Sequence, residues 1–441
     1  MIPAAAGHAD QQDQVGRGPL PQSLLPDSAT VDSSGHCRIA GVDLLHLARQ
    51  FGTPLFVYDE AHVRNRCREA LTAWGDGVAY ASKAFLSKAM ASVALQEGMC
   101  LDVASGGELA VALAAGAPPD RLVLHGNNKL PDELEAAVRM GVRYVVVDSF
   151  EEIDRLELLA KQHRTTVRVL VRVTPGVEAH THAYTSTGQV DSKFGFGLES
   201  GRAAAAVDRI ARSPALDLVG IHGHIGSQVF RTDAFERAVQ VLAGFFLPLD
   251  LPELCIGGGL GVAYVEGETA PTITEWASSV KAAAAAAGIG PHVRLTAEPG
   301  RAVVAAAAVT LYTVGVVKQL PHVRTYVAVD GGMSDNPRPV LYGSGYEAFL
   351  PRATTADRDM VVRIVGRHCE SGDVIVHNAA VPSSLEPGDV LATPVTGAYG
   401  YSMASTYNRV PRPAVVFVSP EGEPRVVLRR ETAQDLMSLE C

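Results

Sequence analysis

The sequence predicts an α/β fold, a (β/α)8 TIM-type barrel followed by an all-β domain, and two features of its pattern support this. Between residues 78 and 301, eight short apolar runs alternate with amphipathic segments rich in Ala, Leu, Glu and Arg. Strands that alternate with helices form parallel sheets, and eight such units over this length are typical of a barrel. After about residue 302, closely spaced β-branched runs broken by Gly, Pro and Asp predict an antiparallel sandwich or barrel.

The apolar runs give the positions of the expected strands. In the barrel they cover residues 78–84, 100–105, 122–126, 144–149, 169–175, 219–226, 253–261 and 294–301. In the C-terminal part they cover residues 308–320, 325–332, 360–369, 373–381, 389–395, 413–419 and 424–431.

These patterns divide the chain into four parts. Residues 1–34 are polar and rich in Gly, Pro, Ser, Asp and Gln, so we expect a disordered tail. We expect residues 35–56 to pack with the β domain, residues 57–305 to form the barrel and residues 306–441 to form the C-terminal β domain. The strand-like region at 42–59 precedes the barrel and fits either domain.

Composition and charge exclude several classes of function. The chain has 441 residues and a net charge of −10 with no basic stripe, so we expect no nucleic-acid partner. No apolar run approaches the roughly 20 residues of a membrane span, and the N-terminus has no secretory signal, so we expect no membrane partner. Six scattered cysteines without CxxC spacing indicate reduced thiols, a cytoplasmic location and no metal site.

Polar residues gather where the predicted barrel strands end. In this fold the functional side chains lie at the carboxyl ends of the strands. These ends carry Lys83, Asp102, His125, Asp148, Arg172, His224, Gly257, Gly258, Gly259, Glu298 and Arg301. The sequence therefore predicts a site at this end of the barrel.

Lys83 ends the first barrel strand, in the motif YASKAF. A lysine in such a position is usually a solvated strand end, and alone it is weak evidence for catalysis. A desolvated lysine, however, has a lowered pKa and forms a Schiff base with an aldehyde. The other polar residues at the strand ends favour this second interpretation.

Three consecutive glycines at 257–259 follow an apolar run, and glycines there let backbone N–H groups approach an anion. Such a run is often only a tight turn, and it does not match GxGxxG, which disfavours a dinucleotide. Ser227, Arg301 and Tyr399 could supply further phosphate contacts. Glu298 has two possible roles. It either pairs with Arg301, three residues later, or it faces the pyridine nitrogen of a bound cofactor and keeps that nitrogen protonated.

Cys369 lies in the motif HCESGD of the predicted β domain. A lone cysteine is normally a small buried hydrophobic residue. His368, Glu370 and Asp373 surround this one in the sequence, which is an unusually polar setting for a core thiol. Cys369 is therefore a candidate proton donor.

Seven motifs together resemble one known family. In chain order they are YASKAF, HIGSQ, GGGLG, EPGR, DGGMSDNPRPVLYG, CESGD and GAYGYSMASTYN. In this order and spacing, over about residues 40 to 440, the chain resembles the diaminopimelate decarboxylases. The resemblance implies the alanine-racemase-like fold (fold type III) with pyridoxal 5′-phosphate as cofactor. It also implies decarboxylation of meso-2,6-diaminopimelate to L-lysine and carbon dioxide, the last step of lysine biosynthesis.

The resemblance also assigns roles to positions of this chain. Lys83 would carry the cofactor as a Schiff base, and His224 would stack on its ring. The cofactor contacts would be Lys83, His224, Ser227, Gly257, Gly258, Gly259, Glu298, Gly300, Arg301 and Tyr399. The substrate contacts would be Arg301, Arg338, Tyr342, Glu370 and Tyr399. The catalytic residues would be Lys83, His224, Glu298 and Cys369.

The resemblance further implies a homodimer in which CESGD enters the partner subunit's site. Cys369 and Glu370 would then act in the neighbouring subunit. Glu370 suits the far ammonium group of the substrate, and Arg338 suits its far carboxylate by bidentate pairing. Residues 179–196 resemble the flexible active-site loop of the family.

Two departures from the family pattern stand out. Cys255 occupies a position where the family usually has Asp or Asn, which puts a contact behind the phosphate cradle in doubt. Gly400 follows Tyr399 where some relatives carry a larger residue, which could alter the pocket.

Three alternatives stay open. A paralogous decarboxylase could act on ornithine, arginine or a pathway-specific amino acid. A racemase of this fold usually has Arg at the pyridine nitrogen and lacks CESGD, so Glu298 and Cys369 argue against it. A catalytically dead homologue should have lost Lys83 or Cys369, and both are present.

Overall fold

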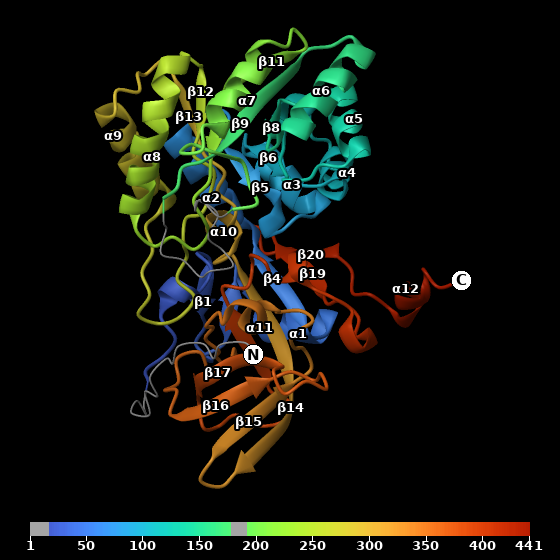
Figure 1. The fold of residues 1–441 in the computed structure, drawn as a ribbon. Coiled ribbons are helices and arrows are strands. Elements are labelled where there is room, and N and C mark those ends of the chain that lie inside the picture. The colour runs from blue at the N-terminus through green and yellow to red at the C-terminus, as the bar shows by residue number, and fades with distance from the viewer. Residues whose placement is uncertain (1–16, 178–191) are drawn as a thin grey trace.

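The computed structural model describes residues 17–177 and 192–441, and it contains a parallel barrel and a separate β domain (Figure 1). The predicted fold class is confirmed, because each of the eight runs expected in the barrel overlaps a strand of the parallel sheet. The barrel strands are β5 (Ala79–Ala81), β6 (Cys100–Val103), β7 (Leu122–Leu124), β8 (Tyr144–Val147), β9 (Val167–Thr174), β11 (Leu216–Gly223), β12 (Glu253–Cys255) and β13 (Arg294–Thr296). Strand β10 (Phe196–Gly197) extends the sheet beside β9.

Backbone hydrogen bonds close the ring of strands. The N–H of Ala79 donates to the carbonyl oxygen of Ala297 at 3.1 Å, and the N–H of Ala81 donates to that of Pro299 at 3.2 Å. These two bonds join β5 to the segment that follows β13. The first and last barrel strands, which carry Lys83 and Glu298 just beyond their ends, are therefore neighbours.

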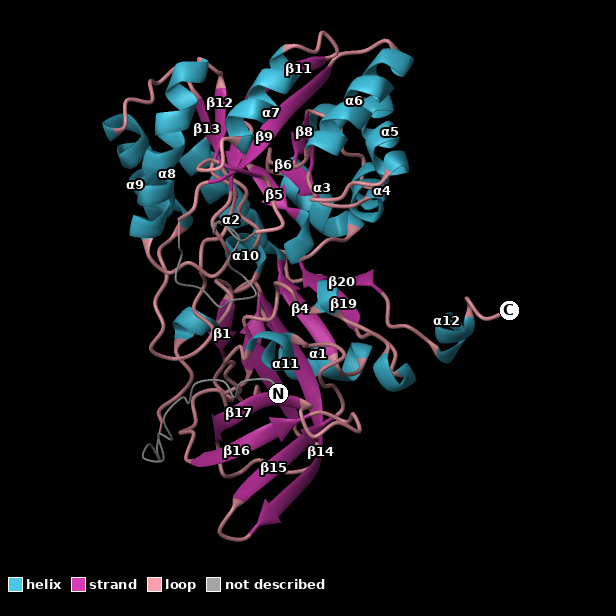
Figure 2. Ribbon diagram, viewed as in Figure 1, coloured by secondary structure: helices cyan, strands magenta, loops and turns pink. Residues whose placement is uncertain are grey.

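Helices surround the barrel (Figure 2). They are α2 (Glu60–Trp74), α3 (Lys88–Gln96), α4 (Gly106–Ala114), α5 (Pro131–Met140), α6 (Phe150–His163), α7 (Arg202–Ala211), α8 (Thr232–Phe246) and α9 (Ile273–Ala286). Local sequence explains where several begin: the side chains of Ser105 and Ser149 cap α4 and α6, and Thr272 with Glu275 forms a capping box on α9. Within the described residues no helix is long and apolar enough to cross a membrane.

Alternating side chains fill the inside of the barrel. Tyr144 and Val146 of β8 belong to a small buried cluster, whereas Val145 and Val147 belong to the main core. This alternation follows from the two-residue period of a strand. Because the interior is packed, a ligand site has to lie at one end of the barrel.

The β domain contains strands from both ends of the chain. They are β4 (Leu55–Asp59), β14 (Ala308–Leu320), β15 (Arg324–Val329), β16 (Met360–Val365), β17 (Val374–Val381), β18 (Val390–Pro394), β19 (Ala414–Val418) and β20 (Pro424–Leu428). The first half of β14 pairs with β4 and β18, and its second half pairs with β15. Three short helices, α10 (Arg301–Val304), α11 (Arg338–Tyr342) and α12 (Ala433–Met437), complete the C-terminal part.

Two local expectations differ from the structure. The β domain is mixed, not purely antiparallel, because β15 pairs with β16 and β4 pairs with β19 in parallel. The long connection from β15 to β16 allows the chain to re-enter the sheet in the same direction. The strand-like region at 42–59 contains β3 (Val42–Asp43), helix α1 (Leu44–Phe51) and β4, and the Asp43 side chain caps that helix.

Residues 17–34, expected as part of a disordered tail, contain regular structure instead. A short 3-10 helix (Gln22–Leu24) is followed by β1 (Ala29–Val31), which pairs with β2 (Cys37–Ile39). Leu20, Leu24 and Leu25 are buried. The expectation of disorder was wrong here because it relied on the average polar composition of the segment and not on these three apolar residues. The part of the expected tail at 1–16 lies outside the described residues.

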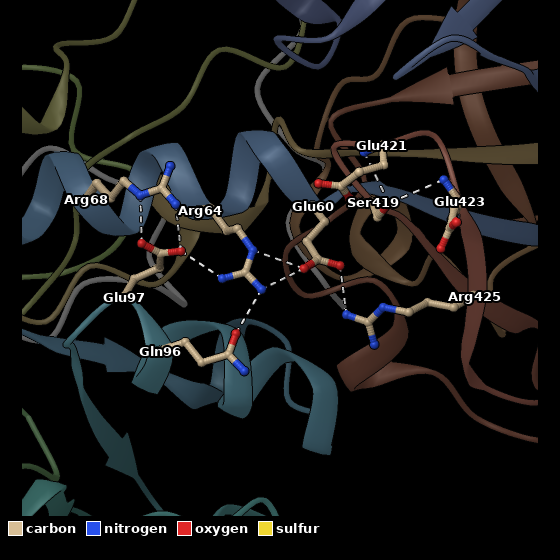
Figure 3. Close-up of polar contacts among 9 residues, drawn as sticks. All are labelled: Glu60, Arg64, Arg68, Gln96, Glu97, Ser419, Glu421, Glu423 and Arg425. Carbon is tan, nitrogen blue, oxygen red and sulfur yellow. Dashed lines mark hydrogen bonds and ion pairs between the residues drawn. The ribbon is translucent and has the colours of Figure 1, made fainter.

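A network of charged side chains joins the barrel to the β19–β20 hairpin (Figure 3). The buried carboxylate of Glu60 in α2 accepts hydrogen bonds from Arg64 at 2.8 Å and from Arg425 of β20 at 2.7 Å. Arg64 also donates to Glu97, at the end of α3, at 2.7 Å. The network therefore links α2 and the end of α3 in the barrel to β20 of the β domain.

Candidate active site

One cavity at the carboxyl end of the barrel collects most of the predicted site residues. Its lining includes Lys83, Asp102, His224, Ser227, Gly258, Gly259, Glu298, Gly300, Arg301 and Tyr399. Gly257 adjoins this lining in the sequence. Tyr399 comes from the β domain, and its backbone N–H donates to the carbonyl oxygen of Ala84 at 2.8 Å. The cavity therefore depends on both domains.

Lys83 lies in a one-turn 3-10 helix (Ser82–Ala84) that directly follows β5. Its side chain is solvent-accessible within the cavity, although protein groups surround it. Burial lowers its pKa, but Tyr399, Asp102 and Glu298 outweigh that effect and raise the pKa above its usual value. The sequence suggests a lowered pKa, and the anionic surroundings explain the difference.

Glu298 follows β13 and is held by two buried histidines. Its Oε1 atom lies 2.9 Å from Nε2 of His125, and its Oε2 atom lies 3.0 Å from Nε2 of His222. Burial raises the pKa of Glu298, but the two histidines outweigh that effect and hold it well below its usual value. The site therefore contains a carboxylate that stays ionised although it is buried.

His224 lies two residues after His222 and faces the cavity. Its Nδ1 atom accepts a hydrogen bond from the backbone N–H of Gly258 at 3.1 Å. Burial and the charges of Lys83 and Arg172 hold its pKa well below its usual value. His224 is therefore a neutral ring in the tautomer with the proton on Nε2.

The glycines after β12 leave no room for side chains. A Cβ atom on Gly258 would lie 2.4 Å from the carbonyl oxygen of Glu298, and one on Gly259 would lie 2.3 Å from that of Gly226. Nearby, Arg301 donates to the Ser227 hydroxyl at 2.9 Å, and its buried Nε has no hydrogen-bond partner. Bare backbone with a hydroxyl and a guanidinium fits a phosphate group.

Arg301 and Arg338 both contact Tyr264. Arg301 donates to the Tyr264 hydroxyl at 2.6 Å, and the Arg338 guanidinium lies 4.2 Å from the centre of the Tyr264 ring. Arg338 also donates to Tyr346 at 2.7 Å and to Ser344 at 3.1 Å. Both arginines are buried, and within the part of the chain that the structure describes neither forms an ion pair with a carboxylate.

Cys369 and Glu370 lie apart from this cavity. Both are exposed in the loop between β16 and β17, and neither lines the cavity of its own chain. The loop itself is well fixed, because Asp373 accepts from the backbone N–H groups of Met333 at 2.6 Å and His368 at 2.8 Å. The structure thus presents the thiol outward on a rigid support.

Of the remaining predicted positions, Tyr342 is described by the structure but does not line the cavity. Tyr342 ends α11, the helix that begins at Arg338, and is partly buried. Most of the expected active-site loop at 179–196 falls within 178–191, which the structure does not describe.

The two departures have local explanations. Cys255 is buried, and its Sγ accepts from the backbone N–H of Gly257 at 3.5 Å, so a thiol still contacts the glycine turn. A Cβ atom on Gly400 would lie 3.0 Å from the carbonyl oxygen of Thr396 and 3.1 Å from the ring of Phe56. A larger residue at 400 would therefore require these neighbours to move.

Two residues that shape the site, His222 and Tyr264, are not predicted from the sequence. His125 is predicted at a strand end, but its contact with Glu298 is not. His222 had a signal, because the period of a strand places it on the same face as His224. Tyr264 had none, since nothing in its sequence neighbourhood indicates two arginines around its ring.

The residues present fit pyridoxal phosphate. The glycine turn, which has no side chains, together with Ser227 and Arg301 suits the cofactor phosphate. Lys83 lines the same cavity, where its amine can form a Schiff base. Glu298 provides the buried anion that would favour a protonated ring nitrogen.

Comparisons with known proteins show the family to which the chain belongs. Residues 60–305 match the family model of the pyridoxal-dependent decarboxylase, pyridoxal binding domain. Diaminopimelate decarboxylase from Mycobacterium tuberculosis is 47% identical over 442 residues, covering 96% of this chain and 98% of that protein. The Bacillus subtilis enzyme of the same name is 46% identical, covering 95% of this chain and 98% of that protein.

Solved structures give the same result. Diaminopimelate decarboxylase from M. jannaschii in co-complex with L-lysine has a TM-score of 0.86 and 32% identity, covering 94% of this chain and 98% of that one. A lysine/ornithine decarboxylase from Vibrio vulnificus, 21% identical with a TM-score of 0.72, shares the fold alone. The chain therefore belongs to the pyridoxal-phosphate-dependent diaminopimelate decarboxylase family.

Proposed function

We propose that the chain decarboxylates meso-2,6-diaminopimelate to L-lysine and carbon dioxide, the last step of lysine biosynthesis, with pyridoxal phosphate as cofactor. The observation that carries this proposal is the pair of buried guanidiniums, Arg301 and Arg338, that have no carboxylate partner among the described residues. A buried charge is costly unless it is paired, so this arrangement favours ligands with two anionic groups. The cofactor phosphate suits Arg301, and a distal carboxylate of the substrate suits Arg338.

The cofactor contacts follow from the cavity. Bound pyridoxal phosphate supplies an aldehyde for an amine and a protonated ring that accepts electrons during loss of carbon dioxide. Lys83 would hold it covalently, the neutral His224 would lie against its ring, and Glu298 would contact the ring nitrogen. Its phosphate would be bound by Ser227, Gly257, Gly258, Gly259, Gly300, Arg301 and Tyr399.

The substrate contacts are proposed on the side of the cavity that faces the β domain. Arg338 would bind the distal carboxylate, with Tyr342, one helical turn later, and Tyr399 beside it. Glu370 would bind the distal ammonium group as an acceptor of charge-assisted hydrogen bonds. Arg301 would contact both the phosphate and the substrate.

We further propose that the active form is a homodimer. Cys369 and Glu370 are exposed and do not line the cavity of their own chain, so a second copy would have to supply them. In that arrangement the Cys369 thiol gives its proton to the carbon that has lost carbon dioxide. A cytoplasmic location is proposed with it, from the sequence expectation alone.

Turnover of meso-diaminopimelate, compared with ornithine and arginine, tests the substrate. We expect lysine as the product and little turnover of the other two, because neither of them offers a distal carboxylate to Arg338. A chain that forms no detectable lysine but acts on ornithine or arginine would instead be a paralogous decarboxylase.

Mixing two inactive variants tests the shared site. Lys83→Ala removes the amine of one site, and Cys369→Ala removes the thiol given to the other. In a randomly exchanged twofold dimer, mixed dimers keep one complete site, so activity should recover to about a quarter of wild type. If the mixture stays as inactive as the separate variants after exchange is verified, Cys369 acts within its own chain or not at all.

A further inference from the structure

Two buried histidines, His125 and His222, contact Glu298 and have no part in the reaction proposed above. Both carboxylate oxygens of Glu298 have a histidine partner, His125 at 2.9 Å and His222 at 3.0 Å. The two imidazole rings lie edge to face, with centroids 4.9 Å apart. All three side chains are at least nine-tenths buried, so water cannot readily take the place of either histidine beside the carboxylate.

Three separate strands bring this group together, and each histidine is fixed. His222 lies in β11, and Glu298 follows β13. His125 follows β7, and its own N–H donates to the carbonyl oxygen of Val103 at 2.8 Å. The next residue, Gly126, is fixed by the buried ammonium of Lys129, which donates to its carbonyl oxygen at 2.8 Å.

We propose that His125 and His222 are positioning residues that keep the Glu298 carboxylate ionised and aimed at the ring nitrogen of the cofactor. This inference rests on the proposed function, since it deepens the role of the same site. A carboxylate buried without donors takes up a proton, whereas hydrogen bonds to its charged form prevent this. With one histidine on each oxygen, the carboxylate keeps further lone pairs for a ring N–H.

Other titratable groups face this carboxylate, and several of them influence its protonation. They are Lys83 after β5, Asp102 in β6, Arg172 in β9, His224 after β11 and Cys255 in β12. Asp102 lies 3.7 Å from the same His125 nitrogen. Burial raises the pKa of Asp102 to about 6, despite the opposing effect of His125. On acidification Asp102 therefore takes up a proton before Glu298 does.

A metal ion is the rival interpretation of this group. The donor atoms of His125, His222 and Glu298 all lie within 4.8 Å of one another. Two ligands of a tetrahedral zinc ion, however, are separated by about 3.4 Å. The two histidine nitrogens approach the carboxylate more closely: His222 forms a hydrogen bond with Oε2 at 3.0 Å, and His125 forms an ion-pair contact with Oε1 at 2.9 Å that lacks hydrogen-bond alignment. The geometry favours direct pairing.

The pH dependence of the bound cofactor's absorbance tests the proposal, because absorbance reports protonation without turnover. His125→Phe and His222→Phe remove the donors, and each should shift the midpoint of the absorbance change by about one pH unit or more. His222→Gln restores an N–H donor and should recover most of the shift. His62→Phe is the matched control, since His62 is equally buried but pairs with Asp27, and it should leave the midpoint unchanged.

A second comparison separates positioning from general damage to the fold. In a Glu298→Gln background, the histidine variants should cause no further shift of the absorbance midpoint and no further loss of cofactor affinity. The carboxylate that the histidines contact is already absent there. Wild-type midpoints in both Phe variants, or equal added losses in that background, would overturn the proposal. So would one tightly bound metal ion per chain that is lost in either variant. These readouts remain valid even if the substrate is not diaminopimelate.

Discussion

Replacing Arg338 with methionine would test how the site recognises the far end of its substrate. Arg338 is 4% exposed, and its guanidinium contacts Tyr346, Ser344 and the ring of Tyr264 but no carboxylate of the described residues. Methionine keeps a long apolar side chain and removes the charge with its donors. The protein would thus lose a buried cation that has no anionic partner of its own.

The size of the effect follows from the contacts that a distal carboxylate would make. Each hydrogen bond to a charged group contributes about 1.5–3 kcal/mol, so a bidentate pair contributes roughly 3–6 kcal/mol before desolvation is counted. Desolvation offsets part of this gain, and we expect kcat/KM for diaminopimelate to fall by about 10²–10⁴. An analogue that lacks the distal carboxylate should lose less than about tenfold, since it never makes these bonds.

Steady-state kinetics on both compounds provide the measurement. Arg338→Lys is the graded variant, because it keeps the charge without the bidentate geometry, and its loss should lie between those of wild type and Arg338→Met. Arg358→Met is the control for losing a buried arginine, since Arg358 pairs with Glu266 and Glu347 away from the cavity lining. Equal losses of Arg338→Met on both compounds would refute recognition of the distal carboxylate.

Three further predictions concern other parts of the chain. Cys369→Ala should retain the cofactor absorbance but lower turnover by about 10²–10⁴, the range for a general acid, and an unchanged rate would remove Cys369 from the mechanism. Gly258→Ala should sharply weaken cofactor binding, because the new Cβ atom would lie 2.4 Å from the carbonyl oxygen of Glu298. Equilibrium dialysis measures this affinity. A wild-type affinity would show that the glycine turn does not fit closely around the phosphate. Burial raises the pKa of Asp335 from 3.8 to about 7. At a pH between these two values the folded protein keeps a proton on Asp335, whereas the unfolded chain has lost it. The contribution of this group to the free energy of unfolding therefore falls as the pH rises. Asp335→Asn should flatten that fall in denaturant titrations across this range, and an unchanged slope would assign it to other groups.

The sequence was most informative where the fold itself imposes the geometry. Eight alternating units predict a barrel, and a barrel places all its strand ends on one face, so Lys83, His224 and Glu298 meet although more than 200 residues separate the first from the last. It was less informative where contacts depend on packing. The buried leucines of residues 17–34 and the raised pKa of Lys83 both arise from neighbours distant in the sequence.

The spacing of Glu298 and Arg301 shows how structure decides between two readings of the same residues. Three residues apart, they could simply neutralise each other. Gly300 and the start of α10 separate them, and their partners differ: Glu298 contacts two histidines, while Arg301 donates to Tyr264 and Ser227. Because Glu298 has its own donors, it does not neutralise Arg301. That buried cation then requires an anion from outside the chain, which is the condition for a phosphate-bearing cofactor.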